Sequence, residues 1–206
     1  FLPTEREKKE NAEVPTPVAL VDEMLDKMPK SFWKKTNKVF EPCCGKGNFV
    51  LGIFDKFYKG MKSKYEGKED KLCKKIIREC LYFGDLEPVN VFITQELLKC
   101  HCIMYSENAI LYDDDFNSYT GSTLDLDVGI EWGVDGFDAV IGNPPYNGNS
   151  GNKGKGHTLW NKFVNISINI WIKKNGYLVY VHPSSWRQIN NKILEIFKKK
   201  QLHYLE

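Results

Sequence analysis

Short apolar runs alternate along this chain with longer segments that repeat apolar residues at helical spacing, and this alternation restricts the fold more than any other feature. The pattern predicts strands near residues 38–42, 80–85, 102–106, 137–142 and 177–182. Helices are expected near residues 17–28, 48–60, 69–79, 88–99, 158–173 and 188–200, and residues 117–136 read as a long polar insertion. Strands and helices that alternate in this way form a parallel sheet with helices on both faces. With 206 residues and 42% hydrophobic content, the chain is long enough for one α/β domain with a real core.

A glycine turn follows the first expected strand. Gly45 and Gly47 stand between that strand and an apolar helix, where their backbone can approach a ligand at the carboxyl end of the sheet. Val50 occupies the position of the third glycine of a dinucleotide-binding motif. The turn therefore predicts a nucleotide-like ligand, and it disfavours the pyrophosphate of a nicotinamide or flavin cofactor.

Two further acids follow expected strands. Asp85 ends the second strand, and an acid at that strand tip suits a ribose diol. Asp115-Phe116 comes after the expected strand at residues 102–106 and offers an acceptor beside an aromatic face, which suits a purine. Taken singly, each of these acids could be a solvated loop residue.

The tetrapeptide Asn143-Pro144-Pro145-Tyr146 ends the apolar run that begins at Phe137. The Asn143 side chain and the Pro144 backbone each offer a carbonyl, and the ring of Pro145 helps to aim the latter. Two such acceptors can hold the hydrogens of an exocyclic amine, while Tyr146 offers a ring on which a base can stack. Read alone, the tetrapeptide is a turn after a strand. Read with the glycine turn, it predicts chemistry on an aromatic amine, and adenine is the best candidate.

In order and spacing, the glycine turn, Asp85, Asp115-Phe116 and the tetrapeptide resemble the amino-group DNA methyltransferases, above all the adenine-specific group. In that group a Thr-Pro helix start precedes the cofactor region, and Thr16-Pro17 matches it, with Thr16 as N-cap and Pro17 at the first helical position. The helix start near Leu159 and the segment 176–187 also match, so the resemblance covers nearly the whole chain.

The resemblance implies a Rossmann-like methyltransferase fold, S-adenosylmethionine as cofactor and DNA adenine as substrate. It places Thr16 and Pro17 near the methionine end of the cofactor, Asp85 on its ribose, and Glu41, Cys43, Gly45 and Gly47 around its middle. Its adenine would lie against Leu86, Asp115 and Phe116. The catalytic residues would be Asn143, Pro144, Pro145 and Tyr146, with Tyr146 and Phe163 against the target base. Cys43-Cys44 and Lys46 stand where small residues are commoner in the group.

Charge is unevenly distributed although the net charge is only +2. Residues 100–152 carry nine acids and no Lys or Arg, so that stretch is −9 and the remainder is +11. A nucleic-acid face must therefore use other segments. The candidates are residues 56–78, the loop at 153–155 and residues 198–200; for the first and last, a solvated lysine face is the favoured interpretation. We expect the Gly/Asn-rich loop after Tyr146 to order over the flipped base.

The six cysteines predict neither a metal site nor a disulfide framework. Cys100-His101-Cys102 has no second pair at zinc-ligand spacing, and the Asp clusters at 113–115 and 125–127 lack the pattern of a calcium loop. Structural thiols indicate a reducing, cytoplasmic setting, and neither a signal peptide nor a membrane span is expected. We expect no metal and no membrane partner.

Three alternatives to DNA adenine methylation remain at this stage. The same tetrapeptide occurs in methyltransferases that act on RNA adenine and on protein glutamine, and a silent methyltransferase-like module could bind nucleic acid or a partner. The RNA enzymes rank second and the glutamine enzymes third. The chain ends where the related fold would begin its last hairpin, and it contains no separate target-recognition domain. We therefore expect a longer polypeptide, with a target-recognition region or a cognate endonuclease as partner.

Overall fold

The computed structural model describes residues 15–147, 159–187 and 192–204, and its centre is a five-stranded parallel sheet. The strands lie in the order β3-β2-β1-β4-β5, and each neighbouring pair is parallel. Their bounds are β1 Val39–Glu41, β2 Leu81–Asp85, β3 Asn117–Thr120, β4 Phe137–Gly142 and β5 Ile172–Tyr180. The α/β class and the parallel sheet expected from the sequence are confirmed.

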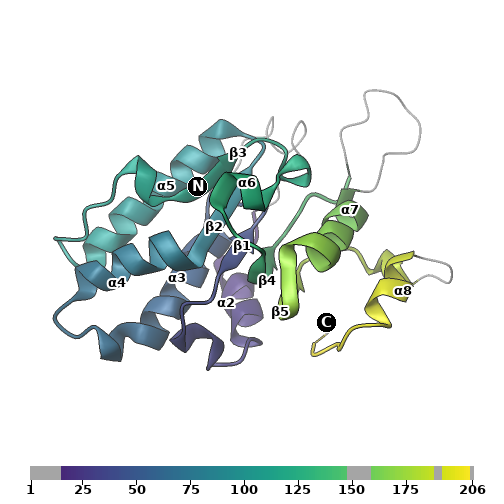
Figure 1. Cartoon of the computed structure of the whole chain (residues 1–206), viewed down its shortest axis with the longest axis horizontal. Helices are drawn as coiled ribbons and strands as arrows, with labels where there is room; N and C mark the ends of the chain where they lie inside the picture. The colour runs from purple at the N-terminus through teal and green to yellow at the C-terminus, as the bar shows by residue number, and fades with distance from the viewer. Residues whose placement is uncertain (1–14, 148–158, 188–191, 205–206) are drawn as a thin grey trace.

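Helices cover both faces of the sheet, and each face buries its own apolar cluster. Val39, Phe83 and Ile141 point into the first cluster with residues of α2 to α5, whereas Phe40 and Val140 point into the second with residues of α6 and α7. Figure 1 shows α3, α4 and α5 on one side of the sheet and α7 on the other. The α-helices are α2 Val18–Asp26, α3 Asn48–Met61, α4 Glu69–Lys75, α5 Pro88–Tyr105, α6 Val128–Trp132, α7 Leu159–Ile166 and α8 Lys192–Phe197. Within the described segments, no helix is both long and apolar enough to cross a bilayer.

The third strand lies in a different place from the one expected. Residues 102–106 do not form a strand, because α5 continues through Tyr105 and keeps Val91, Leu98 and Cys102 buried at helical spacing. The third strand of the sheet is instead β3, inside the segment interpreted as a polar insertion. Its side chains are only half-buried or exposed, because β3 lies at the end of the strand order. An edge strand of this kind lacks the apolar signal that the prediction used.

The helix-to-strand connections show a second difference. Both α4 and α7 end in π-helical segments, Ile76–Cys80 and Ser167–Trp171, which lead directly into β2 and β5. β5 begins earlier than expected, but its pairing with β4 is interrupted after Ile172 and becomes regular from Tyr177 onward. Asn175 has φ 67° within that interruption. The regular part of β5 therefore starts where the sequence places the strand.

The strand order reverses between β1 and β4, which are neighbours in the sheet although far apart in the chain. In open parallel sheets, ligands bind outside the carboxyl ends of the strands at such a switch point. β1 ends in Glu41 ahead of the glycine turn, and β4 ends in Gly142 ahead of the tetrapeptide. The fold thus brings the two motifs to one place.

Candidate functional site at the switch point of the sheet

Glu41 and Gly142, the residues at the strand ends ahead of the glycine turn and the tetrapeptide, pack closely against each other. A Cβ atom on Gly142 would lie 2.2 Å from Glu41 Oε1 and 2.4 Å from Oε2, so only glycine leaves room for this carboxylate. Gly45 and Gly47 have φ angles of 49° and 88°, in the left-handed region that favours glycine. The glycines of the turn and of β4 therefore allow the chain to fold closely around the switch point.

Asp85 holds the glycine turn at the end of β2. Its Oδ2 accepts from the backbone N–H of Gly45 at 2.9 Å, and its Oδ1 accepts from the backbone N–H of Glu87 at 2.9 Å and from Asn90 Nδ2 at 3.2 Å. Leu86 follows directly and is 67% exposed, as a residue facing a ligand site would be. The structure thus places Asp85 beside Gly45, with Leu86 directly after it, and shows that the carboxylate positions the glycine turn.

Glu41 is a buried acid with one oxygen left unpartnered. Its Oε1 accepts from the backbone N–H of Cys43 at 3.0 Å, whereas Oε2 is buried and has no hydrogen-bond partner in the described part of the chain. Burial raises the pKa of Glu41 well above its ordinary value, and the nearby Asp85 carboxylate acts in the same direction. A cationic ligand in this position would supply the missing partner.

Asn143 presents a second buried acceptor. Its Nδ2 donates to the hydroxyl of Thr16 at 3.1 Å, while its Oδ1 is buried and has no hydrogen-bond partner among the described residues. Pro144 is buried and Tyr146 is 38% exposed. The carbonyl of Tyr146 accepts from the backbone N–H of Leu159 at 3.0 Å, which joins the tetrapeptide to the start of α7.

Thr16 differs from its expected role as N-cap of the first helix. Pro17 occupies the N-cap position of α2, with its carbonyl accepting from Val21 N at 3.0 Å. Thr16 is buried, at 6% exposure, and points away from the helix start toward Asn143. Its own carbonyl accepts from Asn48 Nδ2 at 2.8 Å. The Thr-Pro segment therefore contacts both the tetrapeptide and the first residue of α3.

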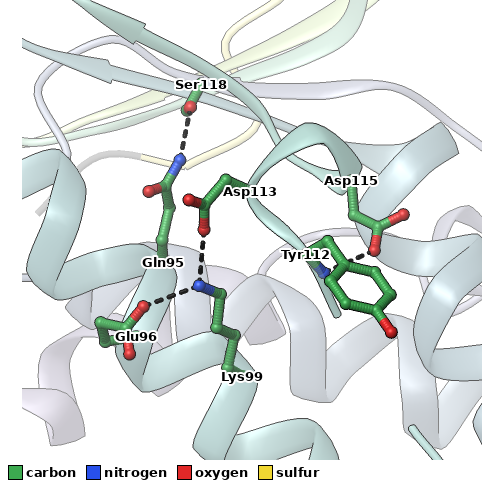
Figure 2. A network of polar contacts seen from close by, with 7 residues as sticks. All are labelled: Gln95, Glu96, Lys99, Tyr112, Asp113, Asp115 and Ser118. Atoms are coloured by element: carbon green, nitrogen blue, oxygen red, sulfur yellow. Dashed lines mark hydrogen bonds and ion pairs between the residues drawn. The ribbon is translucent and has the colours of Figure 1, made fainter. Parts of the chain in front are cut away.

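Asp115 and Phe116 do not lie at this site, contrary to the sequence-based expectation. They precede β3 and lie at the amino end of the strands, because Asn117 pairs with Tyr82 near the start of β2. Asp115 forms an ion pair with Arg78 and accepts from the backbone N–H of Tyr112 at 2.8 Å. Figure 2 shows this segment tied to α5, with Lys99 bonded to Asp113 at 2.6 Å. Both residues stabilise the fold and cannot hold a ligand at the carboxyl edge.

Residues at the other end of β3 lie at the carboxyl edge of the sheet, beside Asp85 and Pro42. The backbone N–H of Gly121 donates to the carbonyl of Asp85 at 2.9 Å, and the hydroxyl of buried Thr123 donates to the carbonyl of Pro42 at 2.9 Å. Thr123 was not predicted from the sequence, because the apolar pattern gave no sign of the strand before it.

Thr94 is another residue that the sequence analysis missed. Its side chain is completely buried in α5, and its hydroxyl donates to the carbonyl of Gly45 at 3.2 Å. A polar residue on the apolar stripe of Val91 and Leu98 was the available signal for it. Thr94 therefore stabilises the glycine turn through this hydrogen bond from α5.

Phe163 lies in the core, so its expected place against a target base is not supported. It is 4% exposed and packs in the second apolar cluster, with its ring centroid 6.5 Å from that of Trp171. The Gly/Asn-rich loop expected to order over the base lies outside the described residues. Pro17 follows Thr16 at the start of α2, and the backbone N–H of Cys43 donates to Glu41.

The first candidate for a DNA face, residues 56–78, extends from the far half of α3 to the segment before β2. It therefore reaches the amino edge of the sheet, whereas Asn143 follows the carboxyl end of β4. Three of its cations are paired: Lys56 with Asp26 at 2.7 Å, Lys75 with Glu79 and Arg78 with Asp115. These contacts agree with the solvated-face alternative for this segment.

Cys100-His101-Cys102 lies on α5 and its side chains diverge. Cys102 is buried in the first apolar cluster and Cys100 is exposed, while His101 Nε2 lies 2.7 Å from Asp55 Oδ1. Among the described residues, no group of three or more His, Cys, Asp or Glu side chains could hold a metal ion.

The Eco57I restriction-modification methylase family model matches residues 79–205, more than half of the chain. No curated protein matches the sequence. Three solved structures are similar: a protein assigned as a modification subunit of a type I restriction enzyme from Vibrio vulnificus YJ016, the DrdV–DNA complex, and the type I restriction-modification methyltransferase subunit from Streptococcus thermophilus.

Their TM-scores are 0.60, 0.63 and 0.53, at 16%, 18% and 14% sequence identity. The matches cover 93%, 84% and 84% of this chain, but only 40%, 20% and 35% of the other chains. This chain therefore spans less than half the length of these proteins. At such identities the similarity establishes the fold, which is the Rossmann-like methyltransferase fold.

Proposed function

Because the chain belongs to the Eco57I restriction-modification methylase family, we propose that it transfers the methyl group of S-adenosylmethionine to the exocyclic N6 amine of adenine in DNA. The observation that carries the proposal is the Oδ1 of Asn143 at the carboxyl end of β4, which is buried and has no hydrogen-bond partner among the residues that the structure describes. A buried acceptor without a donor costs about 1–3 kcal/mol, so such an atom is retained where a ligand completes it. An exocyclic amine is a donor of the required kind.

The residues around the switch point fit S-adenosylmethionine. Glu41 Oε2 is a buried acceptor without a partner in the described segments, and a ligand with positively charged groups would supply one. Asp85 and Leu86 offer a carboxylate and an exposed apolar side chain for a nucleoside, next to the Gly45 backbone. When bound, the cofactor would supply a methyl group on a positively charged sulfur; that sulfur would leave as a neutral thioether without the help of a metal, and the methylated amine would release one proton to water.

The chain's own contribution is to bind and orient the base. The lone pair of an adenine amine is delocalised into the ring, so the nitrogen attacks only when it moves toward a tetrahedral geometry. Asn143 Oδ1 and the Pro144 carbonyl accept hydrogen bonds from the two N–H groups of the amine and favour that geometry. Tyr146, which is 38% exposed, stacks on the base. Flipping costs a few kcal/mol, and stacking returns about 1–3 kcal/mol.

We place the catalytic domain in residues 1–206 and assign the choice of DNA site to a target-recognition region elsewhere in the whole protein. Supporting this division, the chain spans between 20% and 40% of the three similar proteins. An endonuclease activity, in the same protein or in a partner, is also consistent with a restriction-modification family.

The test is methylation with labelled S-adenosylmethionine on unmethylated DNA and on RNA, followed by identification of the labelled nucleoside by mass spectrometry. Label in deoxyadenosine is the expected result. Label confined to RNA would show that the substrate is RNA and not DNA. No label in either polymer would overturn the proposal for this chain.

Asn143→Ala should abolish transfer while the cofactor still binds, because only the acceptor for the amine is removed. Asn169→Ala is the matched control, since Asn169 is exposed and bonds only to Asn165 among the described residues. Retained transfer by Asn143→Ala would show that the amine is held elsewhere.

A further inference from the structure

Charge is unevenly distributed along the carboxyl edge of the sheet. The described segments that follow β2 and β3 at this edge carry three acids, Glu87, Asp125 and Asp127. Among the described residues that follow the strand ends, the cations are Lys46 in the glycine turn and Arg187 after β5. The strand order places β4, and with it Tyr146, between β1 and β5. A polyanion that reaches Tyr146 is therefore attracted from the β5 side and repelled from the β3 side.

Arg187 lies in the short helix η7, Ser184–Arg187, which follows β5 at this edge. The backbone N–H of Val181 donates to the carbonyl of Gly142 at 3.1 Å, so the chain leaves β5 while still paired to the end of β4. The guanidinium carbon of Arg187 lies 5.5 Å from the centroid of the Trp186 ring, a cation–π distance. Trp186 is buried and belongs to a third apolar cluster with Trp160, Val164 and Ile193.

The guanidinium is exposed and forms no ion pair with any residue in the described part of the chain. The other arginine in the described ranges, Arg78, has its charge matched by Asp115 at the amino edge. A guanidinium that rests on an aromatic ring keeps its N–H donors available, and their planar fork matches two oxygens of a phosphate.

The third apolar cluster joins Arg187 to the tetrapeptide. The ring of His182 stacks on Trp160, with centroids 5.6 Å apart and planes 11° apart, and lies 6.4 Å from the ring of Trp186. The backbone N–H of Trp160 in turn donates to the carbonyl of Tyr146 at 3.4 Å. Figure 1 shows α7, which carries Trp160, on the β5 side of the sheet. The position of Arg187 relative to Tyr146 is thus set by packed rings.

We propose that Arg187 binds a phosphate of the nucleic-acid backbone near the flipped base, so that the strand crosses the carboxyl end of β5. This proposal rests on the proposed function for the base that Tyr146 receives. The group recognised is a phosphodiester, and DNA is its expected source.

Three variants separate a placed contact from general charge. Arg187→Gln removes the charge, and Arg187→Lys keeps it. Lys174→Gln is the matched control, because Lys174 is an exposed cation on the same strand, near its amino end at the opposite edge of the sheet.

Fluorescence anisotropy with a labelled unmethylated DNA duplex and a labelled single-stranded RNA, from about 50 to about 200 mM salt, measures the contact. One phosphate contact contributes about 0.9 to the slope of log K against log salt for a duplex, and about 0.7 for a single strand. Arg187→Gln should therefore lower the duplex slope by about 0.9 and weaken binding about eightfold at about 0.1 M salt. Arg187→Lys and Lys174→Gln should keep the slope of wild type.

An unchanged slope in Arg187→Gln would overturn the proposal. An equal fall in Lys174→Gln would also overturn it, since that pattern indicates the total charge of the protein and no placed contact. A fall with RNA alone would support the phosphate contact and identify RNA as its source, whereas wild-type protein that binds neither polymer would refute it.

The binding measurement needs neither cofactor nor methyl transfer, so it is independent of the test of the proposed function. If labelled S-adenosylmethionine marks neither DNA nor RNA, the proposed function fails, and the salt dependence still decides the role of Arg187.

Discussion

Glu41→Gln should make the protein more stable and less able to bind its cofactor. Glu41 is 1% exposed, one of its oxygens has no partner among the described residues, and Asp85 adds a second negative charge nearby. Glutamine has the same shape and keeps an oxygen that can accept from the Cys43 N–H at the position of Oε1. The substitution therefore removes the buried charge without opening a cavity.

The effect depends on pH, with a sign that follows from the raised pKa of Glu41. Below the ordinary carboxyl pKa, Glu41 is neutral in the folded and the unfolded protein, and wild type and variant have similar stability. As pH rises above that value, the unfolded chain loses the proton more readily, so wild type loses about 1.4 kcal/mol per pH unit relative to the variant. This loss stops once the pH passes the raised pKa of the folded protein.

The final difference comes from the charge, because glutamine leaves an equally buried amide group at the position of Oε2. Each pH unit between the ordinary and the raised pKa contributes about 1.4 kcal/mol. For a chain of this length each kcal/mol moves Tm by about 2–4 °C, so the gap in Tm should widen by about 3–6 °C per pH unit until the raised pKa is passed.

Urea and thermal unfolding of wild type and Glu41→Gln, from about pH 5 to about pH 8, measure the predicted gap. Glu66→Gln, at an exposed glutamate, is the control for the substitution itself. Calorimetry with S-adenosylmethionine should show weaker binding by Glu41→Gln. A stability gap that does not change with pH would refute the reasoning about Glu41, as would a variant less stable than wild type.

Two further substitutions test the division between site and scaffold. Asp115→Asn removes the charge that Arg78 contacts, and because the Arg78 side chain is 56% exposed, water can solvate its guanidinium. The variant should therefore lose only about 1–3 kcal/mol in urea unfolding, the range of a hydrogen bond to a charged group, with unchanged cofactor affinity in calorimetry; weaker binding at unchanged stability would place Asp115 at the cofactor site after all. Gly142→Ala places a Cβ 2.2 Å from Glu41 Oε1, so it should destabilise the protein by about 1–3 kcal/mol and weaken cofactor binding. A variant with the melting temperature and cofactor affinity of wild type would contradict the close packing.

Much of the fold could be predicted because each strand of the sheet centre is apolar and short. β1, β2 and β4 are buried and lie where the apolar runs predicted them. β3 was missed because a half-buried edge strand needs few apolar residues. The exposed run Ile103-Met104 was misinterpreted as a strand, although it continues α5 on the solvent side.

The candidate site also contains residues that could be predicted from the sequence and residues that could not. Glu41, Asp85 and Asn143 could be found from the sequence because each lies at the end of a strand, and the carboxyl ends of parallel strands meet at one edge. Asp115 was misplaced because an error in one strand moved it from one edge of the sheet to the other.

The sequence by itself determined the alternation of strands and helices, the positions of the glycine turn and tetrapeptide at strand ends, and the family resemblance that these motifs carry. These features are local, since they depend on residue types within a few positions of one another. The tertiary structure alone decided that Asp115 pairs with Arg78, that Phe163 is core, and that Thr16 bonds to Asn143 across 127 positions of the chain. Such contacts depend on which elements become neighbours in space, and local periodicity carries no information about that.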